Sequence, residues 1–289
     1  MLPNALFTVF GNGVHMYGIC LAVGIIMCLV VFYSYTKRKK MPSEMQDFVF
    51  FVAIGAIALG FIFAKLYQAI YDWIDKGYFD FYGSGMTVMG GLIGGAAAFL
   101  ALYFGVGKFY FKGKNKDLHK KQFNNVFLTA PICITTAHAF GRIGCLMAGC
   151  CHGELLSTSG YVFGGIWMRG VAKGVWGYYV PTQLYEALFL FVLTAVLTVL
   201  YFKRVNIIMS IYLISYGIWR IFIEFFRADD VGELIPNTIS PSQWQSIVFI
   251  LVGIALIVFY VIKKIPLVLP KEEAKEESVS TGIKEKVGE

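Results

Sequence analysis

Long apolar runs separated by short charged segments dominate the pattern along this chain. Several of these runs are close to the roughly 20 residues that a helix needs to cross a bilayer. They cover approximately residues 14–35, 47–70, 88–106, 124–141, 184–202, 207–226 and 243–262. The pattern therefore predicts an all-α polytopic membrane protein with seven transmembrane helices.

Composition supports this fold class and excludes others. Hydrophobic residues make up 57 % of the 289-residue chain, and charged residues only 15 %. A soluble domain of this length carries about a quarter of its residues as charges, because it has to cover its surface. The composition excludes a disordered chain, a coiled coil and a secreted disulfide scaffold.

The basic residues predict the orientation in the membrane. The chain has 25 Lys and Arg and a formal net charge of +7, and most of the basic residues follow the first, third, fifth and seventh apolar runs. Cytoplasmic loops are enriched in Lys and Arg, so the N-terminus is expected outside and the C-terminus in the cytoplasm. This asymmetry accounts for the basic excess, so no nucleic-acid partner is expected.

Two parts of the chain are distinguished by composition. Residues 1–265 are predicted to form one seven-span catalytic domain. Residues 266–289 are predicted to form a charged, disordered cytoplasmic tail, in which Lys and Glu alternate after Pro270. Residues 1–13 lack a basic segment, which argues against a cleaved signal peptide and for retention of the first apolar run.

Four polar residues lie on one face of the sixth apolar run. At 100° per residue, Tyr216, Arg220, Glu224 and Arg227 fall within a narrow sector of the helix. One interpretation is an internal Arg–Glu pair that offsets its own burial. The other is a polar stripe whose guanidinium groups hold a phosphate by paired hydrogen bonds.

The fourth run brings a second arginine towards the outer side. His138 and Arg142 lie one helical turn apart near its outer end. A single arginine at a helix end often extends its head to the membrane surface. Two arginines on separate helices, with glycines beside them, favour a site for an anionic lipid headgroup.

For some other local patterns, a purely structural role explains the residues as well as a functional role does. Gly90 and Gly91 belong to overlapping small-residue pairs with Gly94 and Gly95, which are typical of close helix packing. Tyr17 lies near the outer boundary, where tyrosines are common in membrane proteins.

Three cysteines and a histidine lie close together on the predicted outer side. Cys145, Cys150, Cys151 and His152 do not have a usual zinc-ligand spacing, and adjacent ligands are awkward. A disulfide is possible outside the cytoplasm, and small residues that pack a turn are an equal alternative. No metal site is predicted.

Six motifs occur in order along the chain and carry a resemblance to a known family. They are residues 15–18 (HMYG), 89–94 (MGGLIG), 141–144 (GRIG) with its continuation to Gly153, 181–186 (PTQLYE), 216–227 (YGIWRIFIEFFR) and 240–243 (SPSQ). With these motifs, nearly the whole chain resembles the prolipoprotein diacylglyceryl transferases of the bacterial cytoplasmic membrane. The family has seven spans with the N-terminus outside.

The resemblance implies a reaction and its partners. The enzyme would transfer the diacylglyceryl group of phosphatidylglycerol to the lipobox cysteine of a prolipoprotein, forming a thioether and releasing glycerol phosphate. Membrane lipids surround the enzyme, its active site faces the outer side, and no cofactor is required. The resemblance also agrees with the absence of any nucleotide-binding motif in the sequence.

The resemblance assigns roles to named residues. Arg142 and Arg220 would hold the phosphate, and Glu224 would orient Arg220. Tyr17 and Tyr216 are expected to complete the catalytic group. The residues expected to bind phosphatidylglycerol are Arg142, Arg220, Arg227, Gly90, Gly91, Gly144 and Gly153.

Departures from the commoner family pattern leave two alternatives open. The position before Gly90, which often carries histidine, is Met89, and a polar loop has become rich in thiols around Cys145 and Cys150. Either the thiolate forms in the positive field of Arg142 and Arg220 without that histidine, or the chain is a lipid-binding paralogue or transporter without the transferase chemistry. His15, His138 and His152 are substitute bases to consider.

Overall fold

The structure is mostly helical and matches the order of the predicted apolar runs. The computed structural model describes residues 7–9, 12–82, 87–170, 174–227 and 240–269. Its long helices are α1 (Met16–Arg38), α2 (Ser43–Lys76), α3 (Val88–Tyr110), α4 (Leu118–Ala148), α5 (Thr182–Phe202), α6 (Ile208–Glu224) and α7 (Pro241–Ile262). A short 3₁₀ turn, η1 (Gly113–Asn115), connects α3 to α4.

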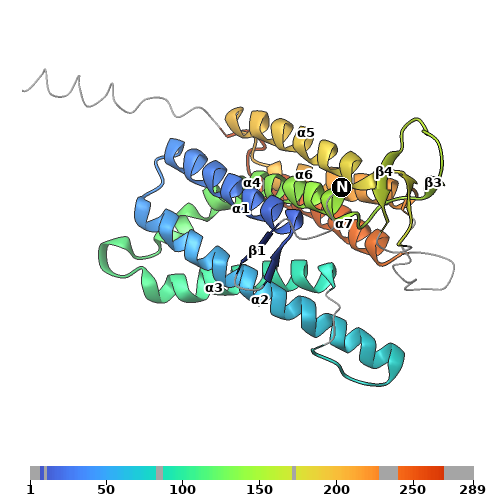
Figure 1. Cartoon of the computed structure of the whole chain (residues 1–289). Helices are drawn as coiled ribbons and strands as arrows, with labels where there is room; N and C mark the ends of the chain where they lie inside the picture. Colours follow the sequence, from blue (N-terminus) through green and yellow to red (C-terminus); the bar gives the residue numbers. More distant parts are fainter. Residues whose placement is uncertain (1–6, 10–11, 83–86, 171–173, 228–239, 270–289) are drawn as a thin grey trace, which may run out of the picture.

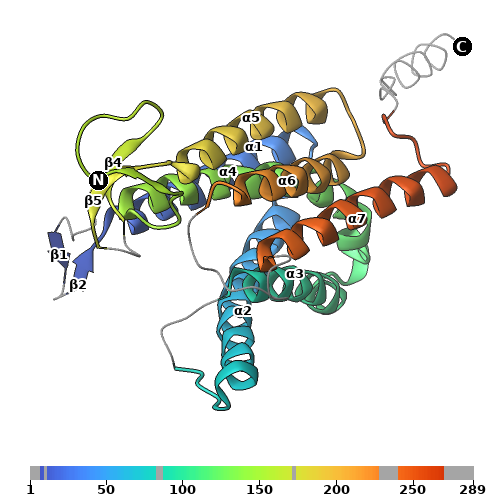
Figure 2. The ribbon, with the colours of Figure 1, turned by 90° about the vertical axis from the view of Figure 1, so that its right-hand side faces the viewer.

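The helices pack in pairs around α4. Helix α1 lies along α4, α4 along α5, α6 along α7, and α2 along α3. Figures 1 and 2 show α2 and α3 as a pair beside the other helices. Large apolar side chains face outward, and Phe51 is 69 % exposed and Leu251 60 % exposed. Such a surface suits contact with lipid rather than water.

Six of the long helices are long and apolar enough to cross a membrane, within the part of the chain that the structure describes. They correspond to α1, α2, α3, α4, α5 and α7. Helix α6 has 17 residues, which gives a length of about 25 Å at 1.5 Å per residue. This is shorter than a hydrocarbon core of roughly 30 Å. The multi-pass membrane fold is therefore supported, with six spans by length and α6 shorter than the predicted run.

Two small antiparallel sheets add to the predicted all-α fold. Strands β1 (Phe7–Val9) and β2 (Asn12–Val14) form a hairpin before α1. Between α4 and α5, strands β3 (Leu155–Ser157), β4 (Ile166–Arg169) and β5 (Trp176–Tyr179) form a sheet in the order β3-β5-β4. This sheet lies at the end of the helices where α5 begins (Figure 2). Alternating burial along β5 fits a short strand with one covered face.

The chain after α7 remains attached to the loop between α5 and α6. Val268 forms an antiparallel bridge with Val205, and Leu269 N–H donates to the Arg204 carbonyl at 2.8 Å. The tail from residue 270 lies outside the described residues.

The glycines at the start of α3 permit close contact with α2. A Cβ atom on Gly90 would lie 2.5 Å from Tyr67 Cβ and 2.8 Å from the Phe63 carbonyl oxygen. A Cβ atom on Gly91 would come no closer than 3.4 Å, to Ala64 Cβ. The two adjacent glycines therefore differ, because only Gly90 requires the absence of a side chain.

We expect Gly90→Ala to destabilise the protein by about 1–3 kcal/mol, because an added methyl group forces α2 and α3 apart. Gly91→Ala is the matched control and should change stability by less than about 1 kcal/mol. Unfolding of both variants in detergent, followed by intrinsic fluorescence, would measure the difference. Equal stability of the two variants would contradict this packing.

Candidate active site

A buried carboxylate, Glu186, is the centre of a charged cluster. It lies in the first turns of α5 and is 2 % exposed. Its Oε2 lies 2.9 Å from Arg142 Nε on α4, and its Oε1 accepts a hydrogen bond from the Tyr216 hydroxyl on α6 at 3.0 Å. One carboxylate therefore joins three helices.

Arg220 and His138 complete the surroundings of Glu186. Arg220 Nη1 lies 3.9 Å from Glu186 Oε2, and His138 Nε2 lies 3.7 Å from Oε1. The N–H groups at Arg142 Nε and Arg220 Nη1 are buried and form no aligned hydrogen bond with any described residue. These contacts are ion pairs with unused donor capacity, which a bound anion could use.

A second carboxylate, Glu224, extends the cluster along α6. Its Oε2 lies 2.9 Å from Arg220 Nη2 and 3.9 Å from Arg227 Nε. Its Oε1 accepts a hydrogen bond from the Ser240 hydroxyl at 3.0 Å, and Arg220 Nη2 donates to Ser242 Oγ at 3.0 Å. Ser240 also caps α7 in a capping box. The start of α7 thus holds the orientation of Arg220 and Glu224.

The charges alternate through the cluster in the order Arg142, Glu186, Arg220, Glu224 and Arg227. Each of these side chains is at most 13 % exposed. Isolated charges at such depth are costly, so pairing is required for a stable fold. Among the described residues, the cluster holds three guanidinium groups and two carboxylates. The unused donors at Arg142 Nε and Arg220 Nη1 suit it to an anionic ligand.

The loop after α4 returns the chain to this cluster. Helix α4 ends at Gly149, whose φ of +72° is the left-handed conformation of a C-terminal cap. Gly153 forms an antiparallel bridge with Arg227, and a Cβ atom there would collide with the Phe226 carbonyl oxygen. Only glycine allows the loop to lie this close to the end of α6.

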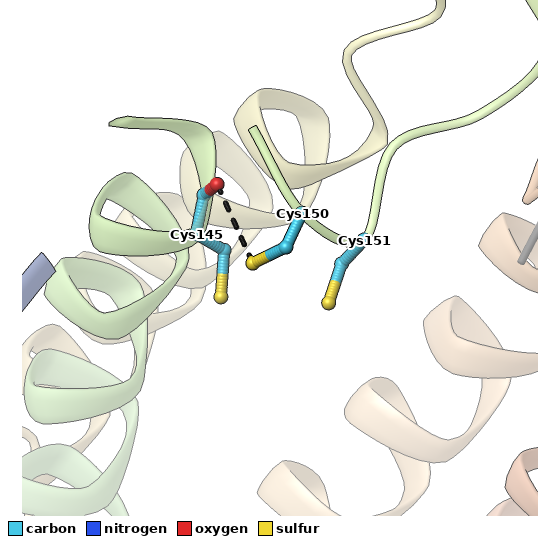
Figure 3. A group of neighbouring side chains, drawn as sticks. All are labelled: Cys145, Cys150 and Cys151. Atoms are coloured by element: carbon cyan, nitrogen blue, oxygen red, sulfur yellow. Dashed lines mark hydrogen bonds between the residues drawn. The ribbon is translucent and has the colours of Figure 1, made fainter. Parts of the chain in front are cut away.

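One cysteine from the last turn of α4 and two from this loop come together, as Figure 3 shows. The sulfur atoms of Cys145, Cys150 and Cys151 all lie within 4.8 Å of one another. Thiol hydrogen bonds from Cys145 and Cys150, together with the positive charges of Arg142 and Arg227, lower the pKa of the Cys151 thiol. A thiol hydrogen-bonded in this way favours its thiolate form.

The structure brings all four predicted charged residues together with Tyr216. Arg142, Arg220, Glu224, Arg227 and Tyr216 all belong to the cluster. The pairing of Arg220 with Glu224 and the approach of Arg142 from α4 follow the geometry expected from the sequence.

The remaining predicted residues lie in two other places. Gly144 allows α4 to approach α1, because a Cβ atom there would lie 3.1 Å from Tyr17 Cδ2. Gly90 and Gly91 face α2, as described above, so a role in lipid binding stays a prediction for them. The side chain of Met89 lies outside the described residues.

Glu186 is not among the site residues predicted from the sequence. It lies in the motif 181–186, whereas most of the predicted buried charges lie in the sixth apolar run. The available signal was an acidic residue at the start of the otherwise uncharged apolar run 184–202. Such a residue is a functional candidate by its depth alone.

The fold and the cluster define a multi-pass membrane protein with a buried arginine–carboxylate site. Residues 4–259 match the family model for prolipoprotein diacylglyceryl transferase. The chain belongs to this family, as its resemblance in sequence motifs predicted.

Similar proteins are named in several bacteria. A phosphatidylglycerol–prolipoprotein diacylglyceryl transferase of Clostridium tetani is 31 % identical over 88 % of this chain and 96 % of its own length. Transferase 2 of Clostridium perfringens is 32 % identical over 85 % of this chain and 90 % of its own length. The Clostridioides difficile enzyme is 30 % identical over 88 % and 93 %.

We expect Glu186→Gln to destabilise the protein by about 3–5 kcal/mol, because it leaves Arg142 and Arg220 without their shared counter-charge. The double variant Arg142→Gln with Glu186→Gln should recover part of this loss, since it removes a charge of each sign. Thermal unfolding in detergent would measure both effects.

The exposed loop residue Glu154 provides the matched control, and Glu154→Gln should unfold like the unchanged protein. If Glu186→Gln were equally stable, the carboxylate would not be the counter-charge that holds the cluster.

Proposed function

We propose that this chain transfers the diacylglyceryl group of phosphatidylglycerol to the thiol of a lipobox cysteine in a prolipoprotein. The products are a thioether and glycerol phosphate. The observation that carries the proposal is the buried cluster of alternating arginines and carboxylates, in which the N–H groups at Arg142 Nε and Arg220 Nη1 have no aligned acceptor among the described residues. Membership of the transferase family supports the same reaction.

In this reaction Arg142 and Arg220 bind the phosphate of phosphatidylglycerol. Planar guanidinium groups pair with phosphate oxygens by two parallel hydrogen bonds. Glu186 and Glu224 act as positioning residues, because each is within 2.9 Å of one of these arginines. Arg227 and Gly153 border the same site through their backbone bridge.

The chemical step is an alkyl transfer from oxygen to sulfur. The acceptor thiolate attacks the terminal carbon of the diacylglyceryl group, the C–S bond forms, and the C–O bond to phosphate breaks. The released phosphate monoester keeps the bonding electron pair, so cations that stabilise its increasing negative charge lower the barrier. Tyr216 and Tyr17 contribute hydroxyl groups near the two arginines and the loop.

The alternative function is that of a lipid-binding paralogue or transporter, which would use the same buried charges to bind the lipid without catalysing a transfer. Family membership favours the enzyme, since the similar proteins are named as transferases over most of their length. Met89 cannot serve as a proton acceptor, so the acceptor thiol must lose its proton by another route.

We expect mass spectrometry to detect a lipobox peptide that is heavier by one diacylglyceryl group after incubation with the purified protein and phosphatidylglycerol. Arg142→Ala and Arg220→Ala should each lower the rate by roughly 10²–10³-fold, because one cation at the reacting phosphate is lost. Arg→Lys at either position should remain slow, since lysine lacks the planar fork.

The control is Arg169→Ala, which removes an exposed arginine of β4 outside the cluster. Its rate should equal that of the unchanged protein. Full activity in both cluster variants would contradict phosphate binding by the arginines, and a folded protein without any product would favour the lipid-binding alternative.

The orientation follows from the charge asymmetry of the loops. We place the N-terminus and the loop between α4 and α5 outside the bacterial cytoplasmic membrane, and the C-terminus in the cytoplasm. The active site then faces outward, where the precursor lipoproteins are exposed. This orientation requires α6 to cross the membrane as the sixth of seven spans.

Reporter fusions test the span count directly. A phosphatase that folds only outside the cytoplasm should be active after residue 165 and inactive after residue 115 or residue 269. If α6 did not span, the chain would cross the membrane six times instead of seven. The C-terminus would then lie outside, and the fusion after residue 269 would become active. A protein that fluoresces only in the cytoplasm should give the reciprocal pattern.

A further inference from the structure

The thiol group formed by Cys145, Cys150 and Cys151 is not used by the phosphate site. All three are free cysteines, partly buried, and come from the last turn of α4 and the loop behind it. Figure 3 shows the three side chains directed to one small region. Within the group, the Cys150 thiol donates to the Cys145 carbonyl at 3.7 Å.

The backbone around these cysteines is fixed by its neighbours on α5. Thr182 Oγ1 donates to the Cys151 carbonyl at 2.8 Å, and Gln183 Nε2 donates to the Cys150 carbonyl at 2.6 Å. Gly149 and Cys151 both have positive φ, of 72° and 59°. A non-glycine residue with positive φ is held against its preference, at a cost of order 1 kcal/mol. This conformation turns two adjacent cysteines to the same side.

The spacing of the sulfur atoms fits a metal ion with small adjustments. Three sulfurs bound to one zinc ion at about 2.3 Å in a tetrahedral arrangement lie about 3.8 Å apart. The observed limit of 4.8 Å for every pair is close to that geometry. Thiolates are soft ligands that select zinc over calcium or magnesium.

Two positively charged side chains lie near the thiol group. Arg142 lies one helical turn before Cys145, and Arg227 is bridged to Gly153 two residues after Cys151. Three thiolates with one Zn²⁺ carry a net charge of −1, and the nearby positive charges of Arg142 and Arg227 lower the electrostatic cost of that charge. The neighbouring cations thus stabilise the complete site while opposing a bare cation without thiolates.

We propose that Cys145, Cys150 and Cys151 bind one Zn²⁺ ion as three thiolate ligands and leave its fourth position open. Three protein ligands with one open position are the arrangement of catalytic rather than structural zinc sites.

The open position has a use in the reaction, a role that rests on the proposed function. The acceptor thiol binds there, loses its proton to solvent, and becomes a zinc-bound thiolate at neutral pH. It attacks the glyceryl carbon beside the arginines, the C–O bond breaks, and the thioether leaves the metal. No oxidation or reduction takes place. The C–S bond replaces the C–O bond, and the proton of the acceptor thiol goes to solvent. This route supplies the deprotonation that Met89 cannot.

Metal content tests the site without reference to activity. The full-length protein, purified in detergent under reducing conditions and dialysed against Zn²⁺, should hold about one zinc per chain. The triple variant Cys145→Ser, Cys150→Ser, Cys151→Ser should hold less than a tenth of that amount. The matched variant Cys20→Ala, Cys28→Ala, Cys133→Ala removes the other three cysteines and should keep its zinc.

Cobalt provides a second measurement on the unmutated chain, independent of how the variants fold. Co²⁺ should give the visible bands of a tetrahedral ion and a thiolate-to-cobalt charge-transfer band. A lipobox peptide with cysteine should change this spectrum, and the same peptide with serine should not.

The outcomes separate this proposal from the proposed function. Unmutated protein without zinc, or a triple serine variant that keeps zinc, would overturn the site. A disulfide between any two of the three cysteines in the protein isolated from membranes would also overturn it. Transfer to the peptide by zinc-free protein would retain the function and reject the zinc route. Zinc bound without transfer would reject only the reaction.

Discussion

The neutralisation of Glu186 is the interaction on which the rest of the site depends. Its carboxylate is almost fully buried and contacts groups from α4 and α6 while lying on α5. Removing one partner of a buried ion pair destabilises a protein by several kcal/mol, because the other charge is left unpaired, whereas the intact ion pair contributes little net stability. The contact therefore specifies how these helices meet more than it strengthens the fold. Arg142 and Arg220 are held at a fixed separation as a result.

Unused hydrogen-bond donors distinguish this cluster from one that only neutralises its own buried charges. Glu186 is shared by Arg142 and Arg220, and Glu224 by Arg220 and Arg227. The buried N–H groups at Arg142 Nε and Arg220 Nη1 have no aligned acceptor among the described residues. In a medium of low dielectric constant, an anion is the natural partner of such groups. This is the physical basis on which we propose that the arginines bind a phosphate.

Much of the helical fold follows from the sequence, because the length of an apolar run is a local property. The single face of Tyr216, Arg220, Glu224 and Arg227 required only helical periodicity. Glu186 was missed because its significance depends on which residues reach it from other helices. The difference between Gly90 and Gly91 also depends on contacts with Tyr67 and Phe63, which the sequence pattern does not encode. The sheet after α4 was missed, since its strands are too short for a clear alternation.

The cysteines illustrate how backbone conformation bears on the proposed zinc site. Adjacent ligands are awkward in an extended or helical backbone, because their side chains diverge. The left-handed conformation at Cys151 removes that obstacle, and Gln183 and Thr182 hold it from the same turns of α5 that carry Glu186. The short segment 182–186 thereby positions both the thiol group and the arginines. An alkyl transfer needs a stabilised leaving anion and a stabilised nucleophilic anion. In the proposed reaction the arginines stabilise the first and the cysteines with zinc the second, and the start of α5 positions both groups.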